Sequence, residues 1–147
     1  MKLNNQTLEQ LPTAIDKPAY SRDDLKHGIV HIGVGGFHRT HQAVYTHRLL
    51  QQGQGTPPYD DGSWSICGIG LRPADRAMQQ ALASQDHLYT VMELSDQHDG
   101  NTQVIGAITD YLYAPDNPEA VIEKLASPDT RIVSLTITEG GYNIDDH

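Results

Sequence analysis

The feature of this sequence that most restricts its fold is a glycine-rich turn, Gly33-Val34-Gly35-Gly36, which lies between two patterns of different period. Before the turn, the β-branched run 29–32 is typical of a buried strand. After it, Ala43, Val44, His47 and Leu50 recur at helical spacing and Gly53 ends the pattern, so this stretch predicts a helix. We therefore expect a central strand, a tight turn and a helix, in that order.

The next part of the chain repeats this strand-and-helix order. Residues 64–71 predict a second strand. Pro73 fits the first turn of a second helix, because its missing N–H would have no partner there. A narrow apolar stripe continues that helix through Ala74, Ala77, Met78, Ala81 and Leu82.

Two β-rich stretches, 87–94 and 103–113, enclose a segment of turn residues and predict an antiparallel hairpin. A third helix is predicted from Asn117 as N-cap, Pro118 after it, and an apolar face of Val121, Ile122 and Leu125. Residues 131–138 predict the last strand. Alternating strands and helices bury their apolar faces as a parallel sheet covered by helices. The predicted class is therefore α/β, a doubly wound parallel sheet with an inserted antiparallel hairpin.

Composition bounds the partners of this chain of 147 residues. With 10 Lys and Arg against 19 Asp and Glu, its net charge is −9, which disfavours nucleic acid and anionic membranes. Cys67 is the single cysteine, so an internal disulfide is excluded, and no apolar run is long enough for a transmembrane helix. The first ten residues lack the apolar stretch of a secretory signal, and we expect a cytoplasmic protein.

The glycine turn carries the chemistry that we expect. Without a Cβ, the chain can turn sharply at Gly33, and a diphosphate can approach the backbone at Gly35. Unpaired N–H groups and the positive end of the helix dipole would stabilise the phosphate oxygens. The generic dinucleotide fingerprint is G-x-G-x-x-G, and His38 occupies its third glycine position. A tight turn without a ligand is the alternative. The candidate cofactor-binding residues here are Ile32, Gly33, Val34, Gly35, Gly36, Phe37, His38 and Arg39.

Two further stretches extend this candidate site. After the second strand, Asp75 could accept the ribose hydroxyls of NAD, whereas Arg72 and Arg76 could pair with the 2′-phosphate of NADP. Alternatively, Asp75 is only an acidic residue in the first turn of the helix and binds no ligand. Thr138 and Glu139 follow the last strand, at the sheet edge where ligands bind, and are candidates for the nicotinamide side; a simple turn is the alternative.

The histidines His31, His38, His41 and His47 crowd the same region and raise the question of a metal site. No cysteine pair, acidic cluster or HExxH motif accompanies them, so we predict no metal. We interpret His31 as a core or edge histidine with satisfied hydrogen bonds, and His41 and His47 as ordinary helix residues.

Four segments, IVHIGVGGFHRTHQA, WSICGIGLRPADR, LYT with VIGAITDYLYAP, and SLTITEGGYN, resemble the polyol-specific long-chain dehydrogenase/reductase family, also called the mannitol dehydrogenase family. The first matches the G-x-G-x-F-x-R-x-H pattern of that family at Gly33, Gly35, Phe37, Arg39 and His41, which accounts for the missing third glycine. The likeness extends from about residue 29 to residue 143.

This resemblance implies a Rossmann-like nucleotide-binding domain over residues 29–147, which is incomplete, with residues 1–28 as a leader packed on it. It implies hydride transfer between a polyol secondary alcohol and NAD, or NADP, to give a ketose. A reductase of sugar acids of the fructuronate type and a non-enzymatic dinucleotide-sensing module are the alternatives. The family's catalytic lysine belongs to a helical C-terminal domain, which we expect to be absent here, and Lys2, Lys17, Lys26 and Lys124 match no catalytic position. We expect no catalytic residue and no polyol oxidation in residues 1–147 alone.

Overall fold

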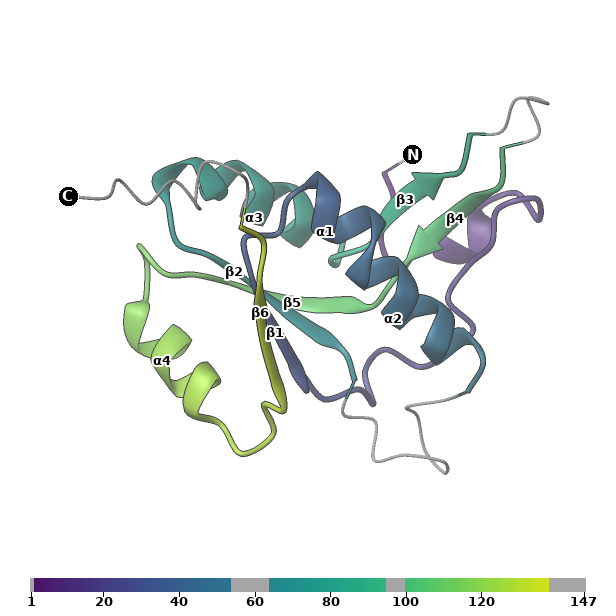
Figure 1. The fold of residues 1–147 in the computed structure, drawn as a ribbon. Coiled ribbons are helices and arrows are strands. Elements are labelled where there is room, and N and C mark those ends of the chain that lie inside the picture. Colours follow the sequence, from purple (N-terminus) through teal and green to yellow (C-terminus); the bar gives the residue numbers. More distant parts are fainter. Residues whose placement is uncertain (1, 54–63, 95–99, 138–147) are drawn as a thin grey trace.

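The computed structural model describes residues 2–53, 64–94 and 100–137. Its main sheet contains four parallel strands in the order β5-β2-β1-β6 (Figure 1). The strands are β1 (Ile29–Ile32), β2 (Ile66–Gly70), β5 (Ile108–Tyr113) and β6 (Ile132–Leu135). The predicted parallel sheet is confirmed, and β1 is an interior strand as expected, paired with β2 on one side and β6 on the other.

Helices cover both faces of this sheet (Figure 1). They are α1 (Gly36–Thr40), α2 (Gln42–Gln51), α3 (Arg76–Ala83) and α4 (Pro118–Ala126), with short 3-10 turns at Leu8–Gln10 (η1) and Pro73–Asp75 (η2). Successive β1 side chains point to opposite faces. Ile29 therefore belongs to the apolar cluster with α2 and α3, while Val30 belongs to the cluster with Val121 of α4.

The predicted helix after the glycine turn is two helices. His41 has φ −121° and ψ −91°, which is not helical, so α1 has five residues before α2 begins. The prediction for α4 is confirmed at its start, where the Asn117 side chain accepts a hydrogen bond from the Ala120 N–H at 3.0 Å. Its predicted apolar face is wrong at Ile122, which is 66% exposed, whereas Val121 is buried.

The predicted antiparallel hairpin is confirmed between 87–94 and the start of 103–113, and it is wrong for the rest of the second stretch. β3 (Tyr89–Met92) pairs antiparallel with β4 (Thr102–Ile105), but the chain then leaves the hairpin, and 108–113 forms β5 of the parallel sheet. Gly106 marks the change. The Arg22 Nε donates to the Gly106 carbonyl at 3.0 Å, and the Gly106 N–H donates to His47 Nδ1 at 3.5 Å. Side chains thus hold the backbone where strand pairing stops.

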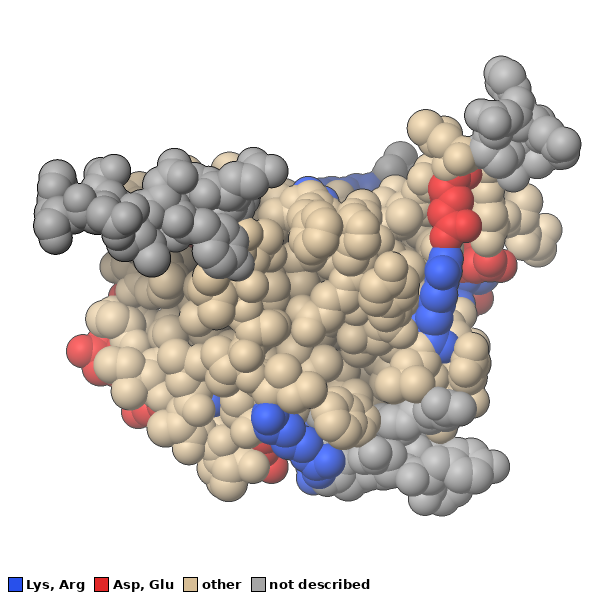
Figure 2. Space-filling view, viewed as in Figure 1, with Lys and Arg blue, Asp and Glu red and all other residues tan. Residues whose placement is uncertain are grey.

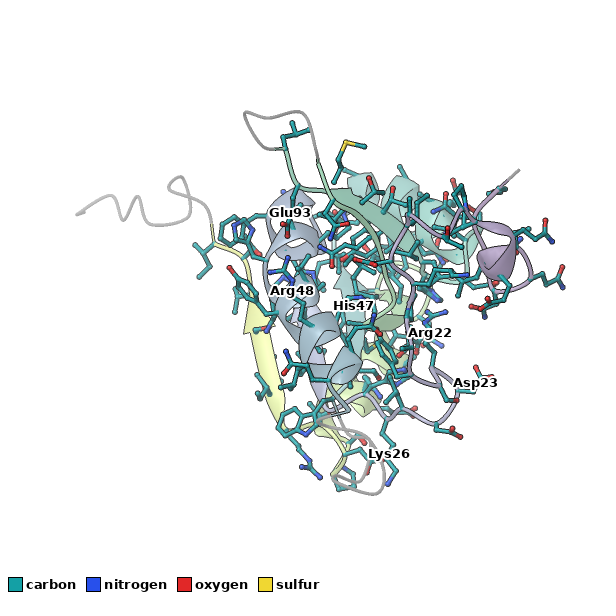
Figure 3. All side chains as sticks on the ribbon, turned by 90° about the vertical axis from the view of Figure 1, so that its right-hand side faces the viewer. Arg22, Asp23, Lys26, His47, Arg48 and Glu93 are labelled. Atoms are coloured by element: carbon teal, nitrogen blue, oxygen red, sulfur yellow. The ribbon has the colours of Figure 1, made fainter. Side chains whose placement is uncertain are left out.

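Residues 2–28 run along the outside of the hairpin and α2. Asp16 forms an isolated parallel bridge to Gln103, so this segment lies beside β4. The Tyr20 hydroxyl lies 2.7 Å from His47 Nδ1, and Arg22 also donates to the carbonyls of Asp86 and Ile108. Arg22 and His47 both bond the backbone of Gly106, and Figure 3 shows the elements that carry them. At the surface, the ion pair of Arg48 and Glu93 joins α2 to the hairpin. Among the described residues, no helix has the length and apolar character needed to cross a membrane.

Candidate functional site

The glycine turn lies at the carboxyl end of β1, the sheet edge where α/β proteins bind ligands. Gly33 has φ +88°, which only glycine adopts without strain, and its N–H donates to the Ile69 carbonyl of β2 at 2.9 Å. The Gly35 N–H then donates to the Gly33 carbonyl at 2.8 Å, so the chain reverses tightly. The expectation of a sharp turn at Gly33 is confirmed.

Three N–H groups at the start of α1 have no partner within the helix. The first hydrogen bond of this helix runs from the Arg39 N–H to the Gly35 carbonyl at 3.1 Å, so the N–H groups of Gly36, Phe37 and His38 precede the helical ladder. A Cβ built on Gly35 or Gly36 would meet no atom within 4 Å. Among the described residues, nothing crowds the backbone at these two glycines, so an anion can approach it there.

The Phe37 ring does not close this space. It is 65% exposed and stacks on the His41 ring, with 4.2 Å between the ring centroids. His41 Nδ1 lies 2.8 Å from the Phe37 carbonyl, which fixes the pair against the outside of α1. Arg39 lies at the turn, where its Nε donates to the Gly35 carbonyl at 3.3 Å and its guanidinium is 5.7 Å from the centre of the Tyr89 ring. Its carbonyl accepts the Tyr89 hydroxyl at 2.7 Å, so it anchors α1 to the hairpin.

Two glycines of β2 hold the turn in place, and sequence reasoning did not single them out. A Cβ on Gly68 would lie 2.6 Å from Val34 Cγ2 and 2.9 Å from Tyr111 Cδ2. A Cβ on Gly70 would lie 2.5 Å from the Tyr111 hydroxyl and 2.7 Å from Asp75 Cβ. The pair of glycines in the strand, with one residue between them, was the available signal, because strand glycines often mark close approach of other groups.

A cavity of about 240 Å³ lies on the β2 side of the turn, and we call it the β2-side cavity. It is lined by Ile32, Gly33, Leu71, Arg72, Asp75, Leu135 and Thr136. Asp75 both lines the cavity and caps η2, because its Oδ2 accepts from the N–H groups of Leu71 at 3.0 Å and Arg72 at 2.9 Å. Arg76 does not line it. It pairs with Asp116 and stacks over the Tyr113 ring.

A second cavity, of about 400 Å³, lies on the other side of the turn, and we call it the β6-side cavity. It is lined by His31, Phe37, His38, Gln42, Ser134, Leu135, Thr136 and Ile137. Leu135 and Thr136 line both cavities, so the two are neighbours at the carboxyl end of β6.

The two buried histidines of the β6-side cavity differ in their hydrogen bonds. His31 Nδ1 lies 2.9 Å from Ser134 Oγ, and Nε2 lies 3.2 Å from Thr136 Oγ1, so His31 is satisfied, as predicted. His38 stacks on His31 with 3.6 Å between ring centroids, and neither of its ring nitrogens meets a partner. Burial, reinforced by the neighbouring His31, lowers the pKa of His38 to about 3. Burial also lowers the pKa of His31 below its ordinary 6.5, so the neutral form of both rings is favoured at pH 7.

The remaining candidates lie elsewhere. Thr138 and Glu139 are outside the described residues. Within residues 2–53, 64–94 and 100–137, no cluster of three or more His, Cys, Asp or Glu side chains could hold a metal ion. His47 is buried against Tyr20, away from His38.

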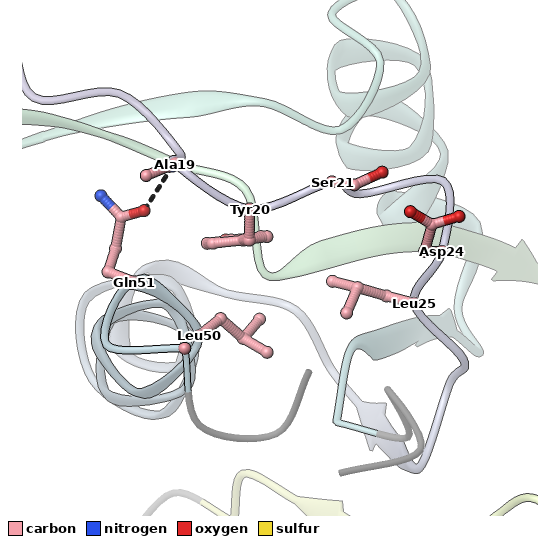
Figure 4. Close-up of a pocket in the computed structure, with 8 residues that line it drawn as sticks. Ala19, Tyr20, Ser21, Asp24, Leu25, Leu50 and Gln51 are labelled. Atoms are coloured by element: carbon pink, nitrogen blue, oxygen red, sulfur yellow. Dashed lines mark hydrogen bonds between the residues drawn. The ribbon is translucent and has the colours of Figure 1, made fainter. Parts of the chain in front are cut away.

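A larger cavity, of about 680 Å³, lies between the N-terminal segment and the end of α2 (Figure 4). Tyr20, Leu25 and Leu50 line it, and the Ala19 N–H donates to Gln51 Oε1 at its rim. It shares no lining residue with the glycine turn, so it is separate from the candidate site.

A family model described as the mannitol dehydrogenase Rossmann domain matches residues 27–147. The mannitol 2-dehydrogenase of Aspergillus oryzae is 54% identical over 147 residues, covering 97% of this chain and 28% of the relative. That of Phaeosphaeria nodorum is 50% identical over 147 residues, covering 100% and 24%.

Two solved structures are similar to this chain over nearly its whole length. A structure of Pseudomonas fluorescens mannitol 2-dehydrogenase in ternary complex with NAD and D-mannitol superposes with a TM-score of 0.90 at 55% identity, covering 99% of this chain and 28% of that chain. A substrate-free D-sorbitol dehydrogenase superposes with a TM-score of 0.85 at 40% identity, covering 99% and 29%. The chain thus spans about a quarter of the length of the relatives that it matches.

Proposed function

Because the chain belongs to the mannitol dehydrogenase family, we propose that it is the NAD-binding part of an oxidoreductase that acts on a polyol. The observation that carries this proposal is the open glycine turn at the carboxyl edge of the sheet. The N–H groups of Gly36, Phe37 and His38 precede the helical hydrogen bonds of α1, and the described residues leave open space beside Gly35 and Gly36, so this backbone suits a diphosphate.

The two cavities indicate how the dinucleotide would be oriented on the turn. They lie on either side of the turn and share Leu135 and Thr136, so one extended ligand can reach both. We place the adenosine half in the β2-side cavity and the diphosphate on the turn. The nicotinamide half then falls in the β6-side cavity.

Asp75 favours NAD over NADP in this arrangement. Its Oδ2 accepts two backbone N–H groups, and its carboxylate lines the β2-side cavity, where it can accept ribose hydroxyls and repel a 2′-phosphate. Arg76, a candidate for NADP, is held by Asp116 and Tyr113 instead. The ternary complex of the P. fluorescens relative contains NAD, which supports the same choice.

Within this proposal, bound NAD supplies the hydride acceptor for oxidation of the polyol. The residues of this chain bind and orient the cofactor. The turn holds the diphosphate, and Thr136, at the end of β6, lines the junction between the two cavities. Transfer to and from a mannitol-like polyol is the activity that the similar enzymes suggest for the complete protein.

Titration calorimetry of residues 1–147 with NAD and NADP tests the proposal. We expect NAD to bind and NADP to bind more weakly. Asp75→Asn keeps an acceptor for the two N–H groups but removes the charge, so NAD affinity should fall by roughly tenfold while NADP affinity rises or is unchanged. Urea unfolding of the variant provides the stability control. Absence of binding by both dinucleotides would overturn the assignment.

A further inference from the structure

His38 is a buried polar side chain whose hydrogen bonds are missing. It is 2% exposed, and Nδ1 and Nε2 are the buried side-chain atoms without a partner in the part of the chain that the structure describes. Buried polar groups in native proteins are nearly always paired, because desolvation without a partner is costly. An exception of this kind at a cavity wall indicates a group that a ligand satisfies.

Ser134 and Thr136 cannot supply the missing bonds, because their hydroxyls already bond His31. Ser134 Oγ donates to Gln42 Oε1 at 3.2 Å, so His31 must donate from Nδ1 to Ser134 Oγ. Its Nε2 is then the acceptor for the Thr136 hydroxyl. This chain of bonds leaves His31 fully used, and His38 stacks on it face to face with an interplanar angle of 9°.

The β6-side cavity is suited to an uncharged group. None of the described residues that line it is Lys, Arg, Asp or Glu. In Figure 2 the charged side chains of the visible face lie toward the edges of the molecule and not at its centre. Apolar walls come from Phe37, Leu135 and Ile137. A neutral imidazole offers one N–H donor and one acceptor, so it complements a group that also carries both, such as a carboxamide or a hydroxyl.

We infer that His38 hydrogen-bonds the nicotinamide riboside half of the dinucleotide, through its carboxamide or its ribose hydroxyls. The inference rests on the proposed function, because the diphosphate on the glycine turn is what brings this half to the β6-side cavity. It assigns the unpaired ring to one part of the ligand, and it explains why an apolar residue does not occupy this buried position.

The test compares His38→Met with the wild-type chain, using ADP, ADP-ribose and NAD as three separate ligands. Met has a similar volume and no unpaired ring nitrogens. We expect the ligand-free variant to unfold at the same urea concentration or higher. The preference for NAD over ADP should fall about tenfold. Loss already seen with ADP-ribose assigns the bond to the ribose, and loss seen only with NAD assigns it to the nicotinamide.

The matched control is His27→Met, which changes a half-buried histidine that lines a different cavity and does not contact the glycine turn or the β6-side cavity. It should leave the preference for NAD over ADP unchanged. An unchanged preference in His38→Met overturns the inference. If wild type binds neither ADP nor NAD, it is the proposed function that fails.

A measurement on the wild-type chain covers the case in which His38→Met does not fold. In long-range nitrogen–proton spectra, the ring nitrogen signals of His38 should move when NAD is added and stay in place with ADP. Equal shifts with both ligands, or none with either in a chain that binds them, would contradict the inference.

Discussion

Substitution of Gly68 by Ala tests whether β2 holds the glycine turn in place. The added Cβ would lie 2.6 Å from Val34 Cγ2 and 2.9 Å from Tyr111 Cδ2, well inside van der Waals contact. Val34 and Tyr111 are both buried, so neither side chain can withdraw into solvent. Overpacking of this kind costs about 1–3 kcal/mol. Because Val34 belongs to the turn, we also expect NAD affinity to fall.

Urea unfolding measures the first effect and calorimetric titration the second. Gly36→Ala is the control, because a Cβ there meets no atom within 4 Å and its φ is not positive. Alanine in the first turn of a helix should leave stability unchanged or raise it by about 0.4–1 kcal/mol. The methyl group would nevertheless stand where the diphosphate approaches, so affinity should fall. A Gly68→Ala chain as stable as wild type would refute the packing argument.

Three further predictions concern stability. Asn117→Ala removes the cap of the Ala120 N–H and should lower the free energy of unfolding by about 1 kcal/mol, whereas Asn117→Asp should not. Burial lowers the pKa of His47 from 6.5 to about 4, so the unfolded chain takes up a proton first as the pH falls. Stability should therefore decline from pH 6.5 to about 4, by at most about 1.4 kcal/mol per pH unit for this group, and His47→Gln should flatten the profile. Arg22→Lys cannot donate to the carbonyls of Gly106, Asp86 and Ile108 together, so we expect a loss of about 2 kcal/mol and faster amide exchange in residues 104–108, and unchanged exchange would contradict it.

The parts of the fold that the sequence predicted are those with local signals. Gly33 takes a positive φ because of its own missing Cβ, and Asn117 caps a helix three residues away. The break at His41 was not predicted, since Gln42, Ala43 and Val44 continue an acceptable helical pattern. The exit of the chain from the hairpin at Gly106 was missed because residues 103–113 look like one uninterrupted β-rich run.

The candidate site likewise contains some features that have a local sequence signal and others that have none. The turn was predicted from the glycines of residues 33–36. The position of Asp75 was predicted separately, from the strand that precedes it. The role of Gly68 depends on Val34 and Tyr111, which lie 34 and 43 positions away in the sequence. No local pattern reports such a contact, because it forms only after the strands have been placed side by side.

By itself, the sequence determined the strand-turn-helix unit, the parallel sheet and the absence of bulky atoms where a diphosphate would lie, because these follow from backbone freedom and short periodicities. The tertiary structure alone decided that β5 joins β2, that β2 presses Val34 into the turn, and that His38 is buried without partners. Those features depend on which distant side chains share a volume, and packing settles that only when the whole chain has folded.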